Sequence, residues 1–313
     1  MINRRELLKG AAIYLAATKL NAQDDTRLQG IFPIVQTPFT SDNRLDTKTL
    51  AAELQFLHES GVQGVVWPQL ASEWAELSPE ERFSGAETVV KTMKGLNPKV
   101  VLGVQGPDIE SAVRYAQHAE KLGPDAIIAL PPKDTSNLDR VAEYYRSIAK
   151  QSKRPLIVQS IGNMSVEFVL QLSKQIPTLR YVKDEAGHTL SRISQYHKLD
   201  PKFGVFTGAH GKTIMDELNR GSIGSMPAAC FGDLYSQFWA LWQQGLREKA
   251  MDKFSRIALL IHQIEAYGLP SLKYVLFLRG IFKNWNCRGK NDRGTFDEAA
   301  QAQLKETYNW VKG

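Results

Sequence analysis

The sequence predicts an α/β fold of the (β/α)8 class, a TIM barrel, followed by a C-terminal helical extension. From Gly30 onward, short apolar runs alternate with longer amphipathic runs over about 200 residues. The apolar runs consist largely of Val, Ile, Leu and Ala, which is typical of parallel strands buried on both faces. The first run is followed by Thr37-Pro38-Phe39 and not by the glycine-rich loop of a doubly wound sheet, so we favour the closed barrel.

Eight strands are expected, each followed by a helix. The expected strands are Ile31–Gln36, Gly64–Trp67, Val100–Val104, Ala126–Leu130, Pro155–Gln159, Leu179–Lys183, Gly204–Thr207 and Ser222–Met226. The expected helices are Thr47–Ser60, Pro79–Lys94, Ile109–Leu122, Leu138–Gln151, Val166–Gln175, Leu190–Leu199, Lys212–Arg220 and Phe231–Gln244.

Capping residues mark several of these helix ends. Ser78-Pro79-Glu80-Glu81 combines a cap residue, a proline at the first helical position and acidic residues in the first turn. Gly61, Gly123 and Gly221 follow expected helices, where glycine commonly ends a helix. Both signals support the helix boundaries that the hydrophobic pattern predicts.

The chain continues beyond the barrel in a mostly helical pattern. Further helices are expected over Leu246–Ala266, Ser271–Asn284 and Phe296–Val311. We therefore expect residues 24–245 to form the barrel and residues 246–313 to form the helical extension, with a role in oligomer contacts. Residues 1–23 are expected to be a separate targeting segment.

That N-terminal segment resembles a twin-arginine export signal. Arg4 and Arg5 precede a weakly apolar run over Ala11–Ala17, and Leu20-Asn21-Ala22 is a candidate cleavage site. The run is too short to span a bilayer, so no stable membrane span is expected. If the segment is such a signal, the protein is exported or periplasmic. The alternative is an amphipathic helix that stays attached to a cytoplasmic protein.

Charge and composition exclude several function classes. The formal net charge is +6, of which residues 1–23 contribute +3, and no basic stripe interleaved with aromatic residues remains. Nucleic-acid binding is therefore not expected. Neither the two cysteines nor the six histidines occur at metal-ligand spacings, so metal-free chemistry without a cofactor is expected.

Lys183 is the leading candidate for a catalytic residue. It closes the expected strand Leu179–Lys183, where an ammonium group loses hydration. Loss of hydration favours the neutral amine, the form that attacks a carbonyl carbon to make a Schiff base. The alternative is a lysine that extends its charged end into solvent.

The C-terminal ends of the other strands supply further candidates, because the active sites of such barrels lie at that face. The candidates are Gln36, Thr37, Ser72, Glu73, Gln105, Lys133, Gln159, Ser160, Lys183, His210, Met226 and Pro227. Among them, we assign substrate binding to Thr37, Ser72, Glu73, Gln105, Gln159 and Met226.

Several motifs in order resemble the dihydrodipicolinate synthase / N-acetylneuraminate lyase family from about Gly30 to the end. The shared motifs are Thr37-Pro38-Phe39, Asp46, Glu73-x-x-x-Leu77-x-x-Glu80-Glu81-Arg82, Gly103, Val182-Lys183-Asp184, Gly208 and Gly221-x-x-Gly224. The resemblance implies a class I aldolase-type barrel in which Lys183 forms the Schiff base. It also implies a homotetramer or homodimer.

The sequence departs from that family at its substrate-binding motifs. The Gly-Thr-Thr-Gly-Glu run is Gln69-Leu70-Ala71-Ser72-Glu73 here, so Leu70 and Ala71 lack the hydroxyl groups that hold the substrate carboxylate. Lys133 stands in place of the proton-shuttling tyrosine, and Gln159-Ser160 in place of a Tyr-Asn pair. These replacements argue against dihydrodipicolinate synthesis and favour a different 2-oxo acid.

Two residues are hypothesised to replace the missing groups. Lys133, placed near Lys183, would favour the neutral form of its amine by like-charge repulsion and would bind the substrate carboxylate. The alternative for Lys133 is an exposed loop lysine. His210, just after the seventh strand, is the candidate acid/base group near neutral pH, and Glu73 is a second candidate. Tyr181 is expected to pack inside the barrel.

These observations favour a metal-free Schiff-base lyase, of aldolase or dehydratase type, whose small-molecule substrate is pyruvate or a longer 2-oxo or sugar acid. Two other classes of function remain open. One is a non-catalytic keto-acid or sugar-acid binding protein on the same barrel, and the other is an oligomeric scaffold.

Overall fold

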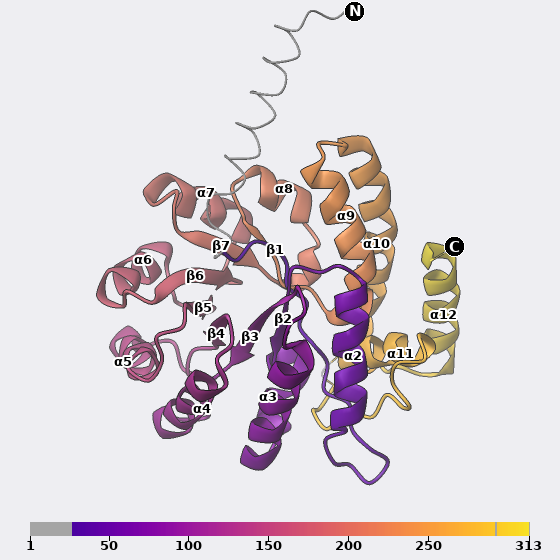
Figure 1. Cartoon of the computed structure of the whole chain (residues 1–313). Coiled ribbons are helices and arrows are strands. Elements are labelled where there is room, and N and C mark those ends of the chain that lie inside the picture. Colours follow the sequence, from indigo (N-terminus) through magenta and orange to yellow (C-terminus); the bar gives the residue numbers. More distant parts are fainter. Residues whose placement is uncertain (1–26, 292, 313) are drawn as a thin grey trace, which may run out of the picture.

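The computed structural model describes residues 27–291 and 293–312, which form a (β/α)8 barrel with a C-terminal helical extension (Figure 1). The expected targeting segment, residues 1–23, lies outside the described residues. All strands pair in parallel, and the order in the sheet is β1-β8-β7-β6-β5-β4-β3-β2. Within the described ranges, no helix is both long and apolar enough to cross a bilayer.

The strands match the expected positions with small shifts at their ends. Their bounds are β1 Gly30–Ile31, β2 Gly64–Trp67, β3 Lys99–Gly103, β4 Ala126–Ala129, β5 Leu156–Ser160, β6 Leu179–Asp184, β7 Gly204–Thr207 and β8 Gly224–Ser225. The first and last strands are shorter than expected. The chain after β1 nevertheless closes the barrel, because Ile34 bridges both Val66 and Ala228 in parallel.

The barrel helices also match the expected ranges. Their bounds are α2 Thr47–Glu59, α3 Pro79–Met93, α4 Ile109–Leu122, α5 Leu138–Ala149, α6 Val166–Gln175, α7 Thr189–Leu199, α8 Ile214–Asn219 and α9 Gly232–Gln243. The expected cap of α3 is present: the Ser78 hydroxyl accepts from the Glu81 N–H, and the Glu81 carboxylate accepts from the Ser78 N–H. Gly123 follows α4 with a φ of 75°.

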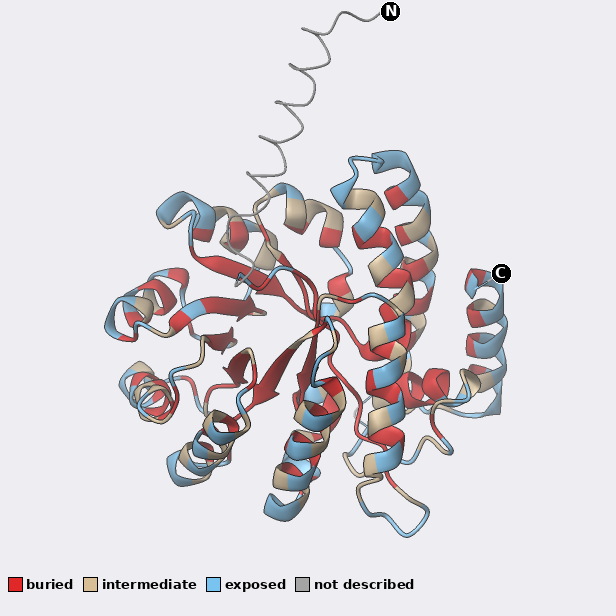
Figure 2. Ribbon diagram, in the orientation of Figure 1, coloured by how far each residue is buried: buried red, intermediate tan, exposed pale blue. Residues whose placement is uncertain are grey.

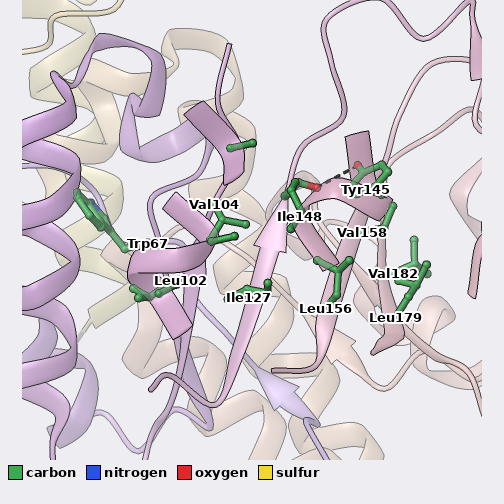
Figure 3. Packing of buried hydrophobic residues seen from close by; sticks show 14 of the residues in the cluster. Trp67, Leu102, Val104, Ile127, Tyr145, Ile148, Leu156, Val158, Leu179 and Val182 are labelled. Carbon is green, nitrogen blue, oxygen red and sulfur yellow. Dashed lines mark hydrogen bonds between the residues drawn. The ribbon is translucent and has the colours of Figure 1, made fainter. Parts of the chain in front are cut away.

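Apolar side chains fill the barrel on both sides of the sheet. Inward-facing residues such as Phe32, Ile128 and Phe206 are fully buried and form a core inside the cylinder. Outward-facing residues such as Trp67 and Val158 pack against the helices (Figure 3). The helices bury the sides that face the sheet and expose the opposite sides (Figure 2). Because both faces are apolar, polar groups are confined to the strand ends.

The extension consists of α10 (Arg247–Tyr267), α11 (Leu269–Leu278) and α12 (Glu298–Lys312). These helices share an apolar cluster with α9. The Arg279 guanidinium fixes the end of α11 to the start of α9 through two hydrogen bonds to Asp233, at 2.7 and 3.0 Å. The expectation that this helix runs to Asn284 was wrong, because Gly280 adopts a φ of 73° and ends it.

A buried ion pair joins the extension to the loop after β2. Lys273 on α11 and Glu73 pair directly, and each side chain is only 1% exposed. The Glu73 carboxylate also accepts the backbone N–H groups of Arg288 and Gly289, at 2.6 and 2.8 Å. Lys273 Nζ donates to the Asn286 carbonyl at 2.7 Å. The segment after α11 is therefore held against the mouth of the barrel.

Replacing Lys273 with Met is expected to lower the free energy of unfolding by about 3–5 kcal/mol, because it leaves the Glu73 carboxylate buried without its counter-charge. Denaturant unfolding measures the change. The double variant Glu73→Gln/Lys273→Met is expected to recover most of the loss. Lys212→Met, which removes a half-exposed ion pair with Glu265, serves as the control and is expected to change stability by less than about 1 kcal/mol. Equal losses for Lys273→Met and Lys212→Met would contradict the assignment.

A second prediction concerns Glu53, whose side chain is fully buried in α2. Burial raises its pKa well above the usual value, although the Gln36 N–H and the charge of Lys273 oppose the rise. Glu53 is then protonated in the folded chain at pH values where it is ionised in the unfolded chain. Stability from this group is therefore present below about pH 4.3 and is lost as pH rises toward the folded-state pKa.

The variant Glu53→Gln has no group that titrates at this position, so its stability is expected not to fall for this reason as pH rises. Its free energy of unfolding should therefore increase relative to the unaltered protein as pH rises from about 4 to 8. Denaturant unfolding of both proteins across that range gives the difference. A difference that stays constant with pH would show that Glu53 has the same pKa in both states.

Candidate active site

A cavity of about 440 Å³ lies at the C-terminal ends of the strands. It is lined from below by residues of the barrel and from above by residues of the extension. The barrel residues are Ile34, Gln69, Leu70, Ala71, Lys183, Glu185, Ala209, His210, Met226 and Ala228, and the extension residues are Gly268, Leu269, Leu272, Lys290, Asn291 and Arg293. A hollow of about 410 Å³ at the opposite face, beside Arg27 and Lys99, has no carboxylate among its described lining residues.

Lys183 reaches this cavity from the end of β6. Its side chain is only 6% exposed, and its Nζ lies 3.0 Å from Glu185 Oε2. The sequence analysis expected loss of hydration to favour the neutral amine and named no carboxylate beside it, whereas the structure places the Glu185 carboxylate in contact with the amine. The reason is strand geometry: residues 183 and 185 lie two apart at the end of a strand, so their side chains point to the same side.

Glu185 is a residue of the cavity that the sequence analysis missed. Its Oε2 accepts from the Gln159 side-chain amide as well as pairing with Lys183, and its Oε1 accepts from the Ala209 N–H at 3.0 Å. Burial raises the pKa of Glu185, but the charge and hydrogen bond of Lys183 and the Ala209 N–H together bring it below its usual value. Glu185 is therefore a carboxylate at neutral pH. The two-residue spacing from Lys183 was the signal in the sequence.

Gly208 provides the space for this pair. A Cβ atom at position 208 would lie 1.8 Å from Glu185 Oε1 and 2.9 Å from Lys183 Cε. Any side chain there would displace the carboxylate or the lysine. Glycine is therefore needed here because the Glu185 and Lys183 side chains lie close to the backbone. The φ of −123° is one that other residues can also adopt, so backbone conformation does not require glycine at this position.

His210 follows in a turn of unusual backbone geometry and lines the cavity. Ala209 and His210 have φ values of 47° and 54°, and the Tyr235 hydroxyl donates to the His210 carbonyl. The Nδ1 atom of His210 is buried without a hydrogen-bond partner among the described residues. Burial lowers the pKa of His210 to about 4. The imidazole is therefore neutral at neutral pH, and the acid/base role expected for His210 stays a prediction.

Three buried amides lie along the wall of the barrel mouth. The Gln69 amide donates to Gln105 Oε1 at 3.0 Å, and Gln105 donates to the Pro68 carbonyl at 2.9 Å. Gln105 therefore orients Gln69, which lines the cavity. The Oε1 atoms of Gln69 and Gln159 are buried with no hydrogen-bond partner in the described part of the chain. Gln69 lines the cavity, so its carbonyl oxygen is the one that can accept a hydrogen bond from a ligand there.

Five of the six residues assigned to substrate binding are absent from the cavity lining: Thr37, Ser72, Glu73, Gln105 and Gln159. The Thr37 hydroxyl donates to the Ser72 carbonyl at 2.5 Å and accepts from the Trp67 indole at 3.0 Å. The Ser72 hydroxyl donates to the Val35 carbonyl at 2.5 Å and accepts from the Gln69 N–H. Glu73 is held by the extension, as described above. These groups shape the loop after β2, because their hydrogen-bonding capacity is used within the protein.

The structure separates Lys133 from the cavity and brings Met226 to it. Lys133 is exposed on the loop after β4 and is not a lining residue, so the structure does not bring the Lys133 ammonium to Lys183 as the sequence analysis hypothesised. Met226 is 2% exposed and forms part of the floor with Ile34 and Ala228. Tyr181 packs deeper inside the barrel, where its hydroxyl accepts from the Leu28 N–H at 3.1 Å.

Lys290, Asn291 and Arg293 from the extension give the roof of the cavity a polar and cationic character. Glu73 fixes the preceding backbone at Arg288 and Gly289. Among the residues described, no group of three or more His, Cys, Asp or Glu side chains is arranged to hold a metal ion. The cavity thus combines a buried amine and a partly buried carboxylate at its base with cations and an amide at its roof.

The chain is similar, along most of its length, to proteins that are named as lyases. It is 26% identical to the probable 2-dehydro-3-deoxy-D-pentonate aldolase YjhH of Escherichia coli, over 80% of this chain and 91% of that protein. It is 22% identical to the L-2-keto-3-deoxyarabonate dehydratase of Azospirillum brasilense, over 84% of this chain and 88% of that protein. One relative is thus named an aldolase and the other a dehydratase.

Solved structures share the fold at lower identity. YagE of Escherichia coli, solved in complex with pyruvate, superposes with a TM-score of 0.82 at 20% identity, covering 91% of this chain and 99% of that one. Dihydrodipicolinate synthase of Rhodopseudomonas palustris gives 0.83 at 22% identity, covering 91% and 98%. The sequence model of the Dihydrodipicolinate synthetase family matches residues 27–308, and the chain belongs to that family.

Proposed function

We propose that the protein is a Schiff-base lyase that acts on a 2-oxo acid through Lys183. The observation that carries this proposal is the position of the Lys183 amine, which is buried at the base of a cavity large enough for a small ligand. Members of the family to which the chain belongs are named lyases and aldolases. The proposed reaction needs no metal ion, because the iminium itself accepts electrons.

The proposed chemistry begins with attack of the Lys183 amine on the carbonyl carbon of the 2-oxo acid. The carbonyl oxygen leaves as water, and the resulting iminium withdraws electrons from the adjacent carbon atoms. Cleavage of a C–C bond then gives an aldolase, and loss of a hydroxyl group gives a dehydratase. Both outcomes use the same amine and the same iminium, so the amine alone does not decide between them.

We infer that the substrate is a 2-oxo sugar acid longer than pyruvate. The cavity extends from Lys183 to the roof residues Lys290 and Asn291, and polar groups line both ends. The partnerless carbonyl oxygen of Gln69, at the cavity wall, fits a hydroxyl group of such a chain. The names of the aldolase and dehydratase relatives both describe 2-oxo-3-deoxy sugar acids.

Two further features remain proposals. A homodimer or homotetramer is proposed from the resemblance to the family, with the extension as the contact surface. Export by the twin-arginine route is proposed from residues 1–23, and a cytoplasmic protein is the alternative.

Borohydride reduction in the presence of 2-oxo acids tests the proposed imine directly. We expect a covalent adduct on Lys183 with pyruvate and with 2-oxo-3-deoxy sugar acids, because borohydride reduces the imine to a secondary amine that does not hydrolyse. Peptide mass spectrometry locates the adduct. Lys183→Ala is expected to abolish the adduct. Lys133→Ala is the matched control, and it is expected to form the adduct at the unaltered rate because Lys133 is exposed outside the cavity.

The products then separate the possible functions. Release of pyruvate and an aldehyde identifies an aldolase, and loss of water without pyruvate release identifies a dehydratase. Ligand-induced stabilisation with no adduct on Lys183 would contradict the lyase and leave a binding protein.

A further inference from the structure

We propose that Glu185 is the proton-transfer group that forms and hydrolyses the Lys183 imine. This inference rests on the proposed function, since it requires that Lys183 react with a carbonyl group. Imine formation needs a base to take a proton from the ammonium and an acid to release the carbonyl oxygen as water. The carboxylate of Glu185 lies at the right place for both steps.

The geometry places Glu185 against the reacting nitrogen. Its Oε2 is 3.0 Å from Lys183 Nζ, within the distance at which a proton passes along a hydrogen bond. The Ala209 N–H holds Oε1 at 3.0 Å, and the Gln159 amide contacts Oε2. Glu185 is also a cavity-lining residue, so it can reach the oxygen of a bound carbonyl group.

No other lining residue in the described ranges combines these properties. Glu185 is the one carboxylate among the described residues that line the cavity, and no tyrosine hydroxyl is among them. His210 lines the cavity as a neutral imidazole, and its Nδ1 makes no hydrogen bond to another described residue. Glu73, the carboxylate that the sequence analysis favoured, pairs with Lys273 instead.

The proposed sequence of proton transfers balances. The Lys183 ammonium gives one proton to Glu185, and the neutral amine attacks the carbonyl carbon while the π electrons move to oxygen. Glu185 returns its proton to that oxygen, takes a second proton from the nitrogen, and delivers it to the departing hydroxyl group. The C–O bond breaks, water leaves, and the nitrogen lone pair forms the C=N bond of the iminium. Two of the three ammonium protons end in water, and Glu185 is regenerated as a carboxylate.

The electrostatics of the pair suit this exchange. Burial acts to raise the pKa of Glu185, and the charge of Lys183 acts to lower it. While Lys183 is charged, Glu185 is held as a carboxylate, the form that can accept a proton. Once the nitrogen is neutral, in the amine and in the carbinolamine, the lowering effect of its charge disappears while burial remains. The carboxyl group therefore holds a proton more strongly at the stages where it must carry one.

Chemical rescue distinguishes proton transfer from a purely structural role. The substitution Glu185→Ala leaves a space at the cavity, and formate is small enough to enter it and act as the missing carboxylate. The readout is the rate of imine formation between the whole protein and pyruvate, measured by rapid quenching with borohydride and mass spectrometry. Glu185→Gln, which preserves shape and removes the carboxylate, is the second variant. Thermal unfolding confirms that both variants are folded.

We expect Glu185→Gln and Glu185→Ala to form the imine about 100-fold or more slowly at pH 7, because general acid–base catalysis typically contributes about 10²–10⁴-fold. Formate should accelerate Glu185→Ala in a saturable manner and leave the unaltered protein unaffected. Glu265→Gln is the matched control: Glu265 is 35% exposed, pairs with Lys212 and is not a lining residue, so its rate should be unchanged.

Three results would overturn the inference. One is imine formation by Glu185→Gln at the unaltered rate, which would show that no carboxylate is needed. Another is a slow, folded Glu185→Ala variant that formate does not accelerate, which would assign Glu185 a positioning role. If the unaltered protein forms no adduct with pyruvate or any longer 2-oxo acid, the proposed lyase function fails first and this inference fails with it.

Discussion

The contact between the Lys183 ammonium and the Glu185 carboxylate is the interaction around which the barrel mouth is arranged. A buried ion pair is stable only if further hydrogen bonds satisfy both groups. The Ala209 N–H and the Gln159 amide satisfy the carboxylate, and Gly208 leaves the space that the pair occupies. The lysine therefore lies beside a carboxylate that can exchange a proton with it, as the proposed attack on a carbonyl group requires.

A second buried pair, Glu73 with Lys273, gives the cavity its roof. Glu73 holds the backbone of Arg288 and Gly289, and Lys290 follows directly at the cavity wall. The two ion pairs thus divide the work of the site between chemistry and shape. The barrel supplies the amine and the carboxylate of the proposed chemistry, and the extension supplies the residues that cover them.

The sequence predicted the barrel, the order of its elements and the place of Lys183 correctly, because these depend on hydrophobic period and on strand ends. It did not predict how side chains share hydrogen bonds across loops. Thr37 and Ser72 looked available for a ligand, yet each donates to a carbonyl group of a neighbouring segment. Lys133 looked close to the cavity, but the loop after β4 directs it into solvent. The sequence analysis ended the sixth strand at Lys183. Continuing its alternation of side chains by two residues would have placed Glu185 on the same side as Lys183.

The link between Glu73 and Arg288 also has a consequence for biosynthesis. A ribosome releases the loop after β2 long before it releases the segment that neutralises and covers it. Until then, the nascent barrel carries an uncompensated carboxylate beside an uncovered opening. The cover of the cavity is therefore complete only when the segment around Arg288 has been synthesised, and a chain that ends before it would leave the barrel mouth open.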